Sequence, residues 1–247
     1  MEHNYKIIIE YDGTKFVGWQ FQKNGISIQE TIEKKLTKLL KIKIKLIGAG
    51  RTDAGVHATG QCANFKIKKK IKNKNNFLNS INFFLNKKSI SLIDIKKKSL
   101  NFHSRFDAKE RIYEYKITNR IGNLALNKDR VWLVKKKLDI NLMKKGAKIL
   151  EGKHDFSTFR SSSCSAKSPI RKIKSIKVSK KGGDIIIQFR SKSFLQNQVR
   201  SMVGCLKTLS CKDWEMKKFK QSFKSKDRKN CAPPAPACGL YLKKINY

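Results

Sequence analysis

The sequence has few acidic residues, few histidines and no long apolar run, and these scarcities argue against particular classes of protein and kinds of site. No apolar stretch approaches the roughly 18 residues of a membrane-spanning helix, and no apolar segment follows a basic leader at the start. We therefore expect a cytoplasmic protein that neither crosses a membrane nor is secreted. The six cysteines contain no C-x-x-C pair and the four histidines lie far apart, so we expect no metal site and no disulfide framework.

Basic residues dominate the charge of this 247-residue chain. Lysines and arginines number 57 against 18 aspartates and glutamates, which gives a formal net charge of +39. This balance favours a polyanionic partner, because neutralising phosphates releases counterions and supplies affinity that does not depend on sequence. The chain is also crowded with lysine, isoleucine and asparagine, which an A+T-rich coding bias would favour. Drift on solvated faces can explain part of the lysine excess, so charge alone does not establish RNA binding.

The hydrophobic pattern predicts that residues 1–104 form one half of the chain, in the order β-α-β-β-α-β. Ser27 and Glu30 form a capping box at the start of the first helix. The apolar stripe of that helix consists of Ile28, Ile32, Leu36 and Leu39, and that of the second helix of Phe77, Ile81, Phe84 and Leu85. The predicted strands cover residues 5–11, 42–47, 61–67 and 90–95.

Residues 105–247 repeat this order without repeating the sequence, and Gly182 and Gly183 predict a hairpin within them. Strands are expected over residues 111–119, 170–180, 184–191 and 240–245, and helices over 141–150 and 194–209, with an added helix over 214–223. The helix over 194–209 should turn inward Leu195, Val199, Met202, Val203 and Leu206. We therefore predict an α+β fold of two ferredoxin-like (βαββαβ) half-domains, whose antiparallel sheets flank a central RNA-binding cleft.

Residues 48–61 form the one passage that ordinary folding does not explain. Four glycines and the triplet Arg51, Thr52 and Asp53 lie between two apolar alternating runs, a pattern typical of strand, tight loop and strand. Such a loop can hold a carboxylate out at the end of a sheet. Taken alone, Arg51 and Asp53 could equally form a surface ion pair worth about 0 to 1 kcal/mol. A phosphate-binding loop is not expected, because the glycine spacing does not fit and no Gly-Lys-Ser/Thr follows.

The segment Gly50-Arg-Thr-Asp-Ala-Gly-Val-His57, followed by Gly60-Gln61, resembles the signature loop of the tRNA pseudouridine synthase A family. Further blocks that resemble the family follow in order along nearly the whole chain, at residues 11–20, 102–106, 111–115, 152–156, 199–204 and 232–242. The resemblance implies an isomerase that converts uridine to pseudouridine in the anticodon stem-loop of tRNA, without metal or cofactor. It also implies a homodimer in which one tRNA touches both subunits.

Three catalytic residues follow from the resemblance. Asp53 corresponds to the nucleophile, which adds to the sugar or to the ring of the uridine. Arg200 corresponds to an arginine placed against that carboxylate, which keeps it ionised; on the inward face of a helix, an unpaired guanidinium would also be costly. From the strand pattern alone, we would expect Tyr113 to be a packing residue. The resemblance makes it the aromatic that stacks on the extracted uracil, and leaves Tyr115 to the core.

The substrate-binding residues are implied in the same way. Arg51 and Arg105 correspond to the base-flipping arginines, whose planar guanidinium groups both bind phosphate and stack. Thr52 lies between Arg51 and the nucleophile, and His103 and Phe106 share the loop of Arg105. We expect all five to contact the tRNA.

Other candidates are open to two interpretations. Lys167 ends a polar loop, residues 161–167, that suits phosphate contact, although a flexible linker has the same composition. Leu240 and Leu242 are expected at the apolar wall of the uracil pocket, and core packing predicts the same two residues. His57 could act as a general acid, but a lone histidine after a glycine loop is more often structural.

The chain departs from the family at residues 194–198, Phe-Leu-Gln-Asn-Gln, where the family commonly carries a histidine. Glutamine and asparagine cannot change charge near neutral pH, so we assign no proton transfer there. Two rival functions remain at this point: a non-catalytic basic RNA-binding module, and a metal-free ribonuclease that uses Asp53 and His57 as acid and base.

Overall fold

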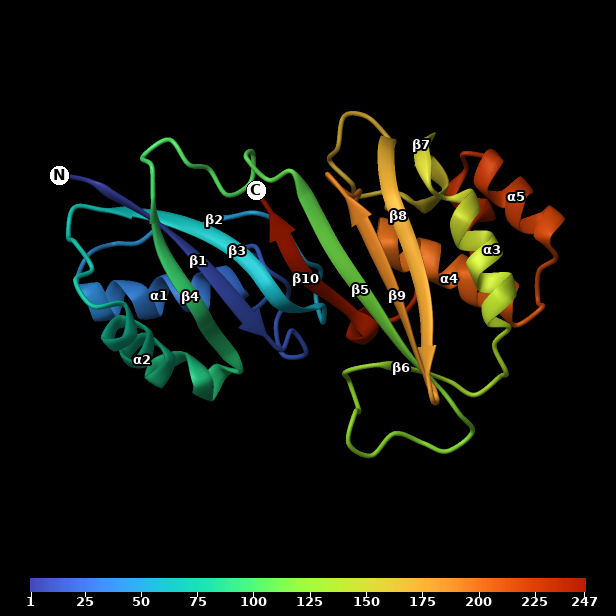
Figure 1. Ribbon diagram of the computed structural model, residues 1–247, viewed down its shortest axis with the longest axis horizontal. Helices are drawn as coiled ribbons and strands as arrows, with labels where there is room; N and C mark the ends of the chain where they lie inside the picture. Colours follow the sequence, from blue (N-terminus) through green and yellow to red (C-terminus); the bar gives the residue numbers. More distant parts are fainter. The chain divides into compact units, whose positions relative to one another are not determined.

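The computed structural model describes residues Met1–Tyr247 and divides them into two compact units. Unit 1 comprises Met1–Lys109 and Tyr241–Tyr247, and unit 2 comprises Glu110–Leu240. Each unit mixes helices with antiparallel strands (Figure 1), which confirms the predicted α+β class. The sequence placed the boundary after residue 104 and gave the last strand to the second half. In the structure the last seven residues belong to unit 1, because they pair with a strand there.

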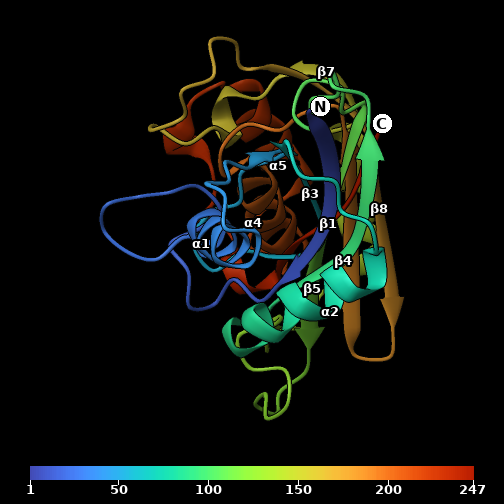
Figure 2. The same cartoon turned by 90° about the vertical axis from the view of Figure 1, so that its left-hand side faces the viewer.

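Unit 1 has the predicted order β-α-β-β-α-β. Its elements are β1 (His3–Tyr11), α1 (Ile28–Leu40), β2 (Ile47–Gly48), β3 (His57–Ile67), α2 (Lys74–Leu85) and β4 (Ile90–Lys98). The strand order is β4-β1-β3, with both β4 and β3 antiparallel to β1. The final strand, β10 (Leu240–Asn246), pairs in parallel with β3. Helices α1 and α2 lie on the same side of these strands (Figure 2).

Helix α1 begins as its sequence predicts, and its side chains also shorten the strand that follows. The Ser27 hydroxyl accepts a hydrogen bond from the Glu30 amide, and Ile28, Ile32 and Leu36 are fully buried. The strand predicted over residues 42–47 is reduced to Ile47–Gly48. Two amides within it donate instead to helix side chains, Ile44 to Thr37 Oγ1 at 3.1 Å and Leu46 to Glu33 Oε1 at 2.7 Å. Once bonded in this way, they are not available to a neighbouring strand.

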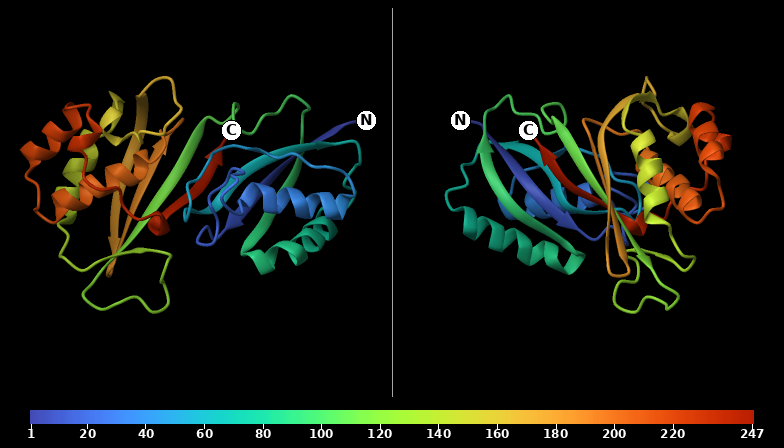
Figure 3. Two further views of the ribbon diagram at one scale, coloured as in Figure 1. Left: turned by 180° about the vertical axis from the view of Figure 1, so that it is seen from behind. Right: turned by 45° about the vertical axis from the view of Figure 1, so that its right-hand side comes forward.

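Unit 2 contains the strands β5 (Glu110–Asn119), β6 (Trp132–Val134), β7 (Gly152–Asp155), β8 (Ile170–Lys181) and β9 (Asp184–Ser191). Its helices are α3 (Ile140–Ile149), α4 (Gln198–Ser210) and α5 (Met216–Lys224). The main strand order is β5-β9-β8-β7, antiparallel throughout, and β6 runs parallel to β5. The three helices gather on one side of this sheet (Figure 3). The hairpin between β8 and β9 turns at Gly182, whose φ is +59°, as the glycine pair predicts.

Helix α4 starts four residues later than the predicted range of 194–209. Asn197 has a φ of 61°, a left-handed conformation that no helix continues through, and the side chain of Gln198 accepts the Leu195 amide at 2.8 Å. The five side chains predicted to face inward are all buried. A turn closed by the Gln198 amide, which donates to the Leu195 carbonyl at 3.1 Å, therefore fixes where the helix begins, and with it the position of Arg200 in the first turn.

None of the helices is both long and apolar enough to cross a membrane. No group of three or more histidine, cysteine and acidic side chains is gathered so that it could hold a metal ion. All six cysteines are free thiols.

Candidate active site

The loop between β2 and β3 carries Arg51, Thr52 and Asp53, and it is fastened to the segment that follows β1. Arg51 is exposed, Thr52 is buried and Asp53 is partly exposed. The Tyr11 hydroxyl and Thr52 Oγ1 share a buried hydrogen bond of 2.8 Å, and the Trp19 amide donates to the Thr52 carbonyl at 3.0 Å. Two blocks that are well separated in the sequence thus form one substructure, which presents the Asp53 carboxylate.

Glycines make this close approach possible. Gly18 forms an isolated antiparallel bridge with Asp53 and has a φ of +114°. A Cβ at Gly18 would lie 2.6 Å from the Thr52 carbonyl oxygen, and one at Gly13 would lie 2.0 Å from the Val56 carbonyl oxygen. A side chain at either position would therefore displace the neighbouring backbone of the loop, which glycine avoids.

His57 is a buried part of this substructure. Only 1% of its surface is exposed, its Nδ1 accepts the Gly13 amide at 3.1 Å and lies 3.1 Å from Asp12 Oδ1, and its ring stacks on Tyr241 with centroids 4.8 Å apart. These contacts hold the β1 end, β3 and β10 together. They favour the structural interpretation of His57 over the catalytic one.

The segment that carries Arg105 is attached to the same strands. The Ser104 amide donates to Asn64 Oδ1 at 2.9 Å, the Ser104 hydroxyl donates to the carbonyl of Ile47, and the Tyr247 hydroxyl donates to the Ser104 carbonyl at 2.8 Å. Ile47 is the first residue of β2, the strand that precedes the Asp53 loop. The two loops are therefore fixed by one pair of strands, β2 and β3.

His103, Arg105 and Phe106 form a stacked group on the surface of unit 1. The His103 ring lies on the Phe106 ring with centroids 4.3 Å apart, and the Arg105 guanidinium lies 5.6 Å from the Phe106 centroid on the ring face. His103 Nδ1 accepts the amides of Arg105 and Phe106, which closes the turn. Phe106 is nonetheless 71% exposed. An exposed aromatic beside a guanidinium is suited to stacking on a nucleic-acid base and to contacting its phosphate.

Two tyrosines of β5 have different surroundings. Tyr113 meets Phe194 edge to face at 5.2 Å, and 8% of its surface is exposed. Tyr115 is completely buried, and its hydroxyl donates to the Pro236 carbonyl at 2.7 Å. Burial raises the pKa of Tyr115 above its usual range. Tyr115 is thus a core residue, as expected from the sequence.

Arg200 is held by the proline-rich segment that precedes β10. Its Nε donates to the Ala235 carbonyl at 2.7 Å, its Nη1 donates to Asn197 Oδ1 at 3.3 Å, and its own carbonyl accepts the Ala235 amide at 3.0 Å. One turn along α4, a Cβ at Gly204 would lie 2.1 Å from the Pro233 carbonyl oxygen. The helix and the segment therefore pack backbone to backbone, and the direction of the guanidinium is fixed from two sides.

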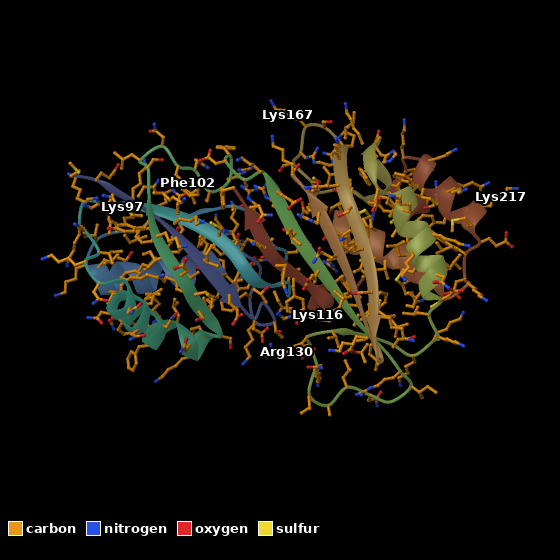
Figure 4. The ribbon with its side chains drawn as sticks, in the orientation of Figure 1. Lys97, Phe102, Lys116, Arg130, Lys167 and Lys217 are labelled. Carbon is orange, nitrogen blue, oxygen red and sulfur yellow. The ribbon has the colours of Figure 1, made fainter.

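The polar loop of residues 161–167 is ordered around one arginine. Arg160 Nη2 donates to the carbonyls of Cys164 and Ala166 at 2.7 and 2.6 Å, and the Ser161 amide donates to the Gln196 carbonyl at 3.1 Å. These bonds argue against a flexible linker. Lys167 is exposed, and Figure 4 shows it on the loop that leads into β8.

The predicted site residues divide between the two units. Unit 1 holds Arg51, Thr52, Asp53, His103, Arg105, Phe106 and Leu242, and unit 2 holds Tyr113, Lys167, Arg200 and Leu240. Leu240 and Leu242 are 5% and 0% exposed, as core packing and an apolar pocket wall both predict.

Sequence reasoning missed the residues that hold the candidates in place. These are Tyr11, Gly13, Gly18, Trp19, Asn197 and Ala235. Most of them fall within the blocks at residues 11–20 and 232–242, so the signal was present, but nothing in one sequence says which loop each block contacts.

Comparison with known proteins gives one family. A family model described as tRNA pseudouridine synthase matches residues 7–107 and 147–247. A protein from Pelagibacter ubique (strain HTCC1062) named tRNA pseudouridine synthase A is 58% identical over 98% of this chain and 99% of its own length. Proteins of the same name from Neorickettsia sennetsu (strain ATCC VR-367 / Miyayama) and Parvibaculum lavamentivorans (strain DS-1 / DSM 13023 / NCIMB 13966) are 43% and 41% identical, again over 98% of this chain. The matched residues cover 99% of the Neorickettsia protein and 98% of the Parvibaculum protein.

Proposed function

Because this chain belongs to the tRNA pseudouridine synthase family, we propose that it isomerises uridine in the anticodon arm of tRNA with Asp53 as the nucleophile. The chain is an isomerase of the pseudouridine synthase type that acts on tRNA, the activity for which relatives up to 58% identical over nearly the whole chain are named. The choice of the anticodon arm and the roles of individual residues are the proposal.

The reaction needs a nucleophile held rigidly at a surface that a flipped nucleotide can reach. Breaking the C1′–N1 bond of uridine and rejoining the base through C5 requires one fragment to be retained, and an ionised carboxylate does this by adding to the sugar or to the ring. One observation carries the assignment: Asp53 is the partly exposed carboxylate of a glycine loop that Gly18 and Trp19 hold through its backbone and Tyr11 holds through the Thr52 hydroxyl. Such preorganisation is what covalent catalysis demands.

Two residues of unit 2 complete the proposed chemistry. We assign to Arg200 the electrostatic role of keeping the reacting carboxylate ionised, supported by the two side-chain bonds that orient its guanidinium. We assign two roles to Tyr113: its ring stacks on the uracil, and its hydroxyl takes part in proton transfer at C5. Its edge-to-face contact with Phe194 supports a fixed ring position. Leu240 and Leu242 would supply the apolar wall of the pocket.

The uridine has to leave its stack before the carboxylate reaches it. Arg51 and Arg105 are the proposed base-flipping residues, with Thr52, His103 and Phe106 as further contacts to the tRNA. The exposed stack of Phe106 against His103 and Arg105 supports this role. Lys167 is proposed to contact phosphate. The net charge of +39 suits a polyanion of this kind.

We also propose that the protein works in the cytoplasm as a homodimer in which one tRNA contacts both subunits, as the family resemblance implies. Sedimentation of the protein alone and with tRNA tests the assembly. A species with two chains and one or two tRNAs is expected, whereas a single chain bound to tRNA would contradict it.

The decisive test uses unmodified tRNA labelled with tritium at C5 of uridine. The wild-type chain should release the label and leave pseudouridine in the anticodon arm, mapped along the RNA. Asp53→Asn should abolish release, because an amide is a poor nucleophile, while tRNA binding measured by filter retention persists. Asp213→Asn, which removes an exposed carboxylate paired with Lys136, is the control and should stay active.

Each rival function predicts a different result. A binding module would release no label even as the wild type. A ribonuclease would shorten the RNA, which remains intact if the chain is only an isomerase. Full activity of Asp53→Asn would contradict the nucleophile assignment.

A further inference from the structure

Two of the six free thiols lie against each other in unit 2. Cys205 Sγ and Cys231 Sγ are 3.5 Å apart, which is within hydrogen-bonding distance for sulfur. Cys205 lies on α4 and is 1% exposed, whereas Cys231, directly after the short helix η3 (Arg228–Asn230), is partly exposed. Cys231 is therefore the more accessible residue of the pair, and its sulfur contacts that of the buried Cys205.

The two sulfurs differ in their hydrogen-bond partners and in the direction of their pKa shifts. Arg228 Nη1 donates to Cys231 Sγ at 3.3 Å and to Ser201 Oγ at 2.7 Å, while the Ala232 amide donates to Cys205 Sγ at 3.4 Å. The hydrogen bond from Cys205 and the neighbouring guanidinium lower the pKa of the Cys231 thiol, against the opposing effect of burial. The same bond and burial raise the pKa of Cys205. Negative charge is thus favoured on the sulfur of Cys231, the more accessible residue of the pair.

We infer that Cys205 and Cys231 form an oxidative modification site, a dithiol that a peroxide converts to a disulfide. The Cys231 thiolate attacks one peroxide oxygen, the O–O bond breaks, and a sulfenic acid and hydroxide form. The Cys205 sulfur then attacks the sulfenic sulfur, which expels water and forms the S–S bond. The thiols lose two electrons and two protons in all, and the peroxide is reduced to two molecules of water.

The consequence for catalysis rests on the proposed function of Arg200. Cys231 leads directly into the segment whose Ala235 carbonyl accepts the Arg200 Nε and whose Pro233 carbonyl closely approaches Gly204, the neighbour of Cys205. A disulfide of about 2 Å requires the two sulfurs to move closer by roughly 1.5 Å. That movement pulls the segment along α4, and we expect it to turn the Arg200 guanidinium away from its present direction.

The test treats the full chain with a small molar excess of hydrogen peroxide. Digestion without reductant, followed by mass spectrometry, should show one peptide pair that joins Cys205 to Cys231 and is two hydrogens lighter than the separate peptides. Pseudouridine formation should fall several-fold and recover after dithiothreitol. Cys231→Ser should retain its activity in peroxide, and Cys211→Ser, which removes another thiol at the end of α4, should still form the cross-link. Cys205→Ser is a second variant that should resist peroxide, in case one substitution disturbs folding.

The possible outcomes separate this inference from the proposed function. If peroxide converts Cys231 to sulfinic acid while no cross-linked peptide forms, the dithiol assignment is wrong. If the cross-link forms but activity is unchanged, its coupling to Arg200 is wrong. If the untreated chain does not modify tRNA, the proposed function fails, while the peptide map still tests the disulfide.

Discussion

The Asp53 loop of unit 1 and the Arg200 turn of unit 2 are both held by segments distant in the sequence, but by different means. The Asp53 loop depends on backbone contacts that only glycine allows, at Gly18 and Gly13, with one buried hydroxyl pair added. The Arg200 turn depends on hydrogen bonds made by the arginine itself, to Ala235 and Asn197. An added side chain at a close backbone contact causes a steric clash that displaces the whole loop. Loss of one hydrogen bond, in contrast, leaves the arginine held by the other. Substitutions in the two regions should therefore differ in the size of their effects.

The largest effect is expected from Gly18→Ala. The new Cβ would lie 2.6 Å from the Thr52 carbonyl oxygen at a residue with φ of +114°, so the loop must move. A displacement of about 1 Å at a reacting group can reduce the rate about a hundredfold. Tritium release from C5-labelled tRNA and thermal unfolding would both be measured.

Gly122→Ala is the matched control, because nothing lies within 4 Å of its added Cβ. Its free energy of unfolding should change by less than about 0.5 kcal/mol, and its activity should not change. Equal activity of the two alanine variants would show that the Asp53 loop does not depend on the close backbone contact at Gly18.

Arg200→Lys should have the next largest effect. Lysine keeps the positive charge but loses the Nε bond to Ala235, and bonds to charged groups contribute about 1.5 to 3 kcal/mol. This corresponds to a loss of roughly ten- to a hundredfold in kcat, with tRNA binding little changed.

Arg120→Lys serves as the control, because Arg120 is exposed and bonds only to carbonyls of its own loop. It should retain full activity. If both lysine variants kept the wild-type kcat, the orientation of Arg200 would not matter for catalysis.

Two tyrosines whose hydroxyls form hydrogen bonds, one in each unit, extend the comparison. Tyr11→Phe removes the bond to Thr52, and Tyr115→Phe removes the bond to Pro236. Each should cost about 1 to 2 kcal/mol of unfolding free energy, because a partner is left unsatisfied. Tyr11→Phe should also lower kcat several-fold with KM unchanged, since it loosens the Asp53 loop. A rise in KM with an unchanged kcat would instead place the effect in tRNA binding.

Much of the fold could be predicted from the sequence because it is locally encoded. The Ser27 cap, the apolar stripe of α1 and the Gly182 turn depend on neighbours within a few residues. The strand predicted over residues 42–47 was wrong because its amides bond to Glu33 and Thr37, which precede it by a full helix turn or more. The short strands β6 and β7 were not foreseen, since three or four residues carry too little pattern.

The candidate site was less accessible to local reasoning. Asp53 stood out by its glycine loop, but its role, and those of Arg200 and Tyr113, came from the family resemblance. The contacts that fix these residues, such as Tyr11 with Thr52 and Arg200 with Ala235, join positions separated by tens of residues. No periodicity encodes such pairs, so only the folded chain reveals them.

The smallest predicted effect concerns pH and Glu151, a carboxylate of unit 2. Burial tends to raise the pKa of Glu151, but bonds from Lys148 at 2.7 Å and from the Ile176 amide at 2.8 Å outweigh it and hold that pKa below its usual value of 4.5. A carboxylate with a depressed folded pKa stabilises the protein above its unfolded pKa, and this contribution is lost as pH falls through the folded value. The melting temperature of the wild type should therefore decline below about pH 4.5 more steeply than that of Glu151→Gln. Asp94→Asn makes the same comparison in unit 1, where Lys74 and Lys96 lower the pKa of Asp94 despite burial. Parallel melting curves for Glu151→Gln and the wild type would mean that Glu151 titrates alike in the folded and unfolded chains.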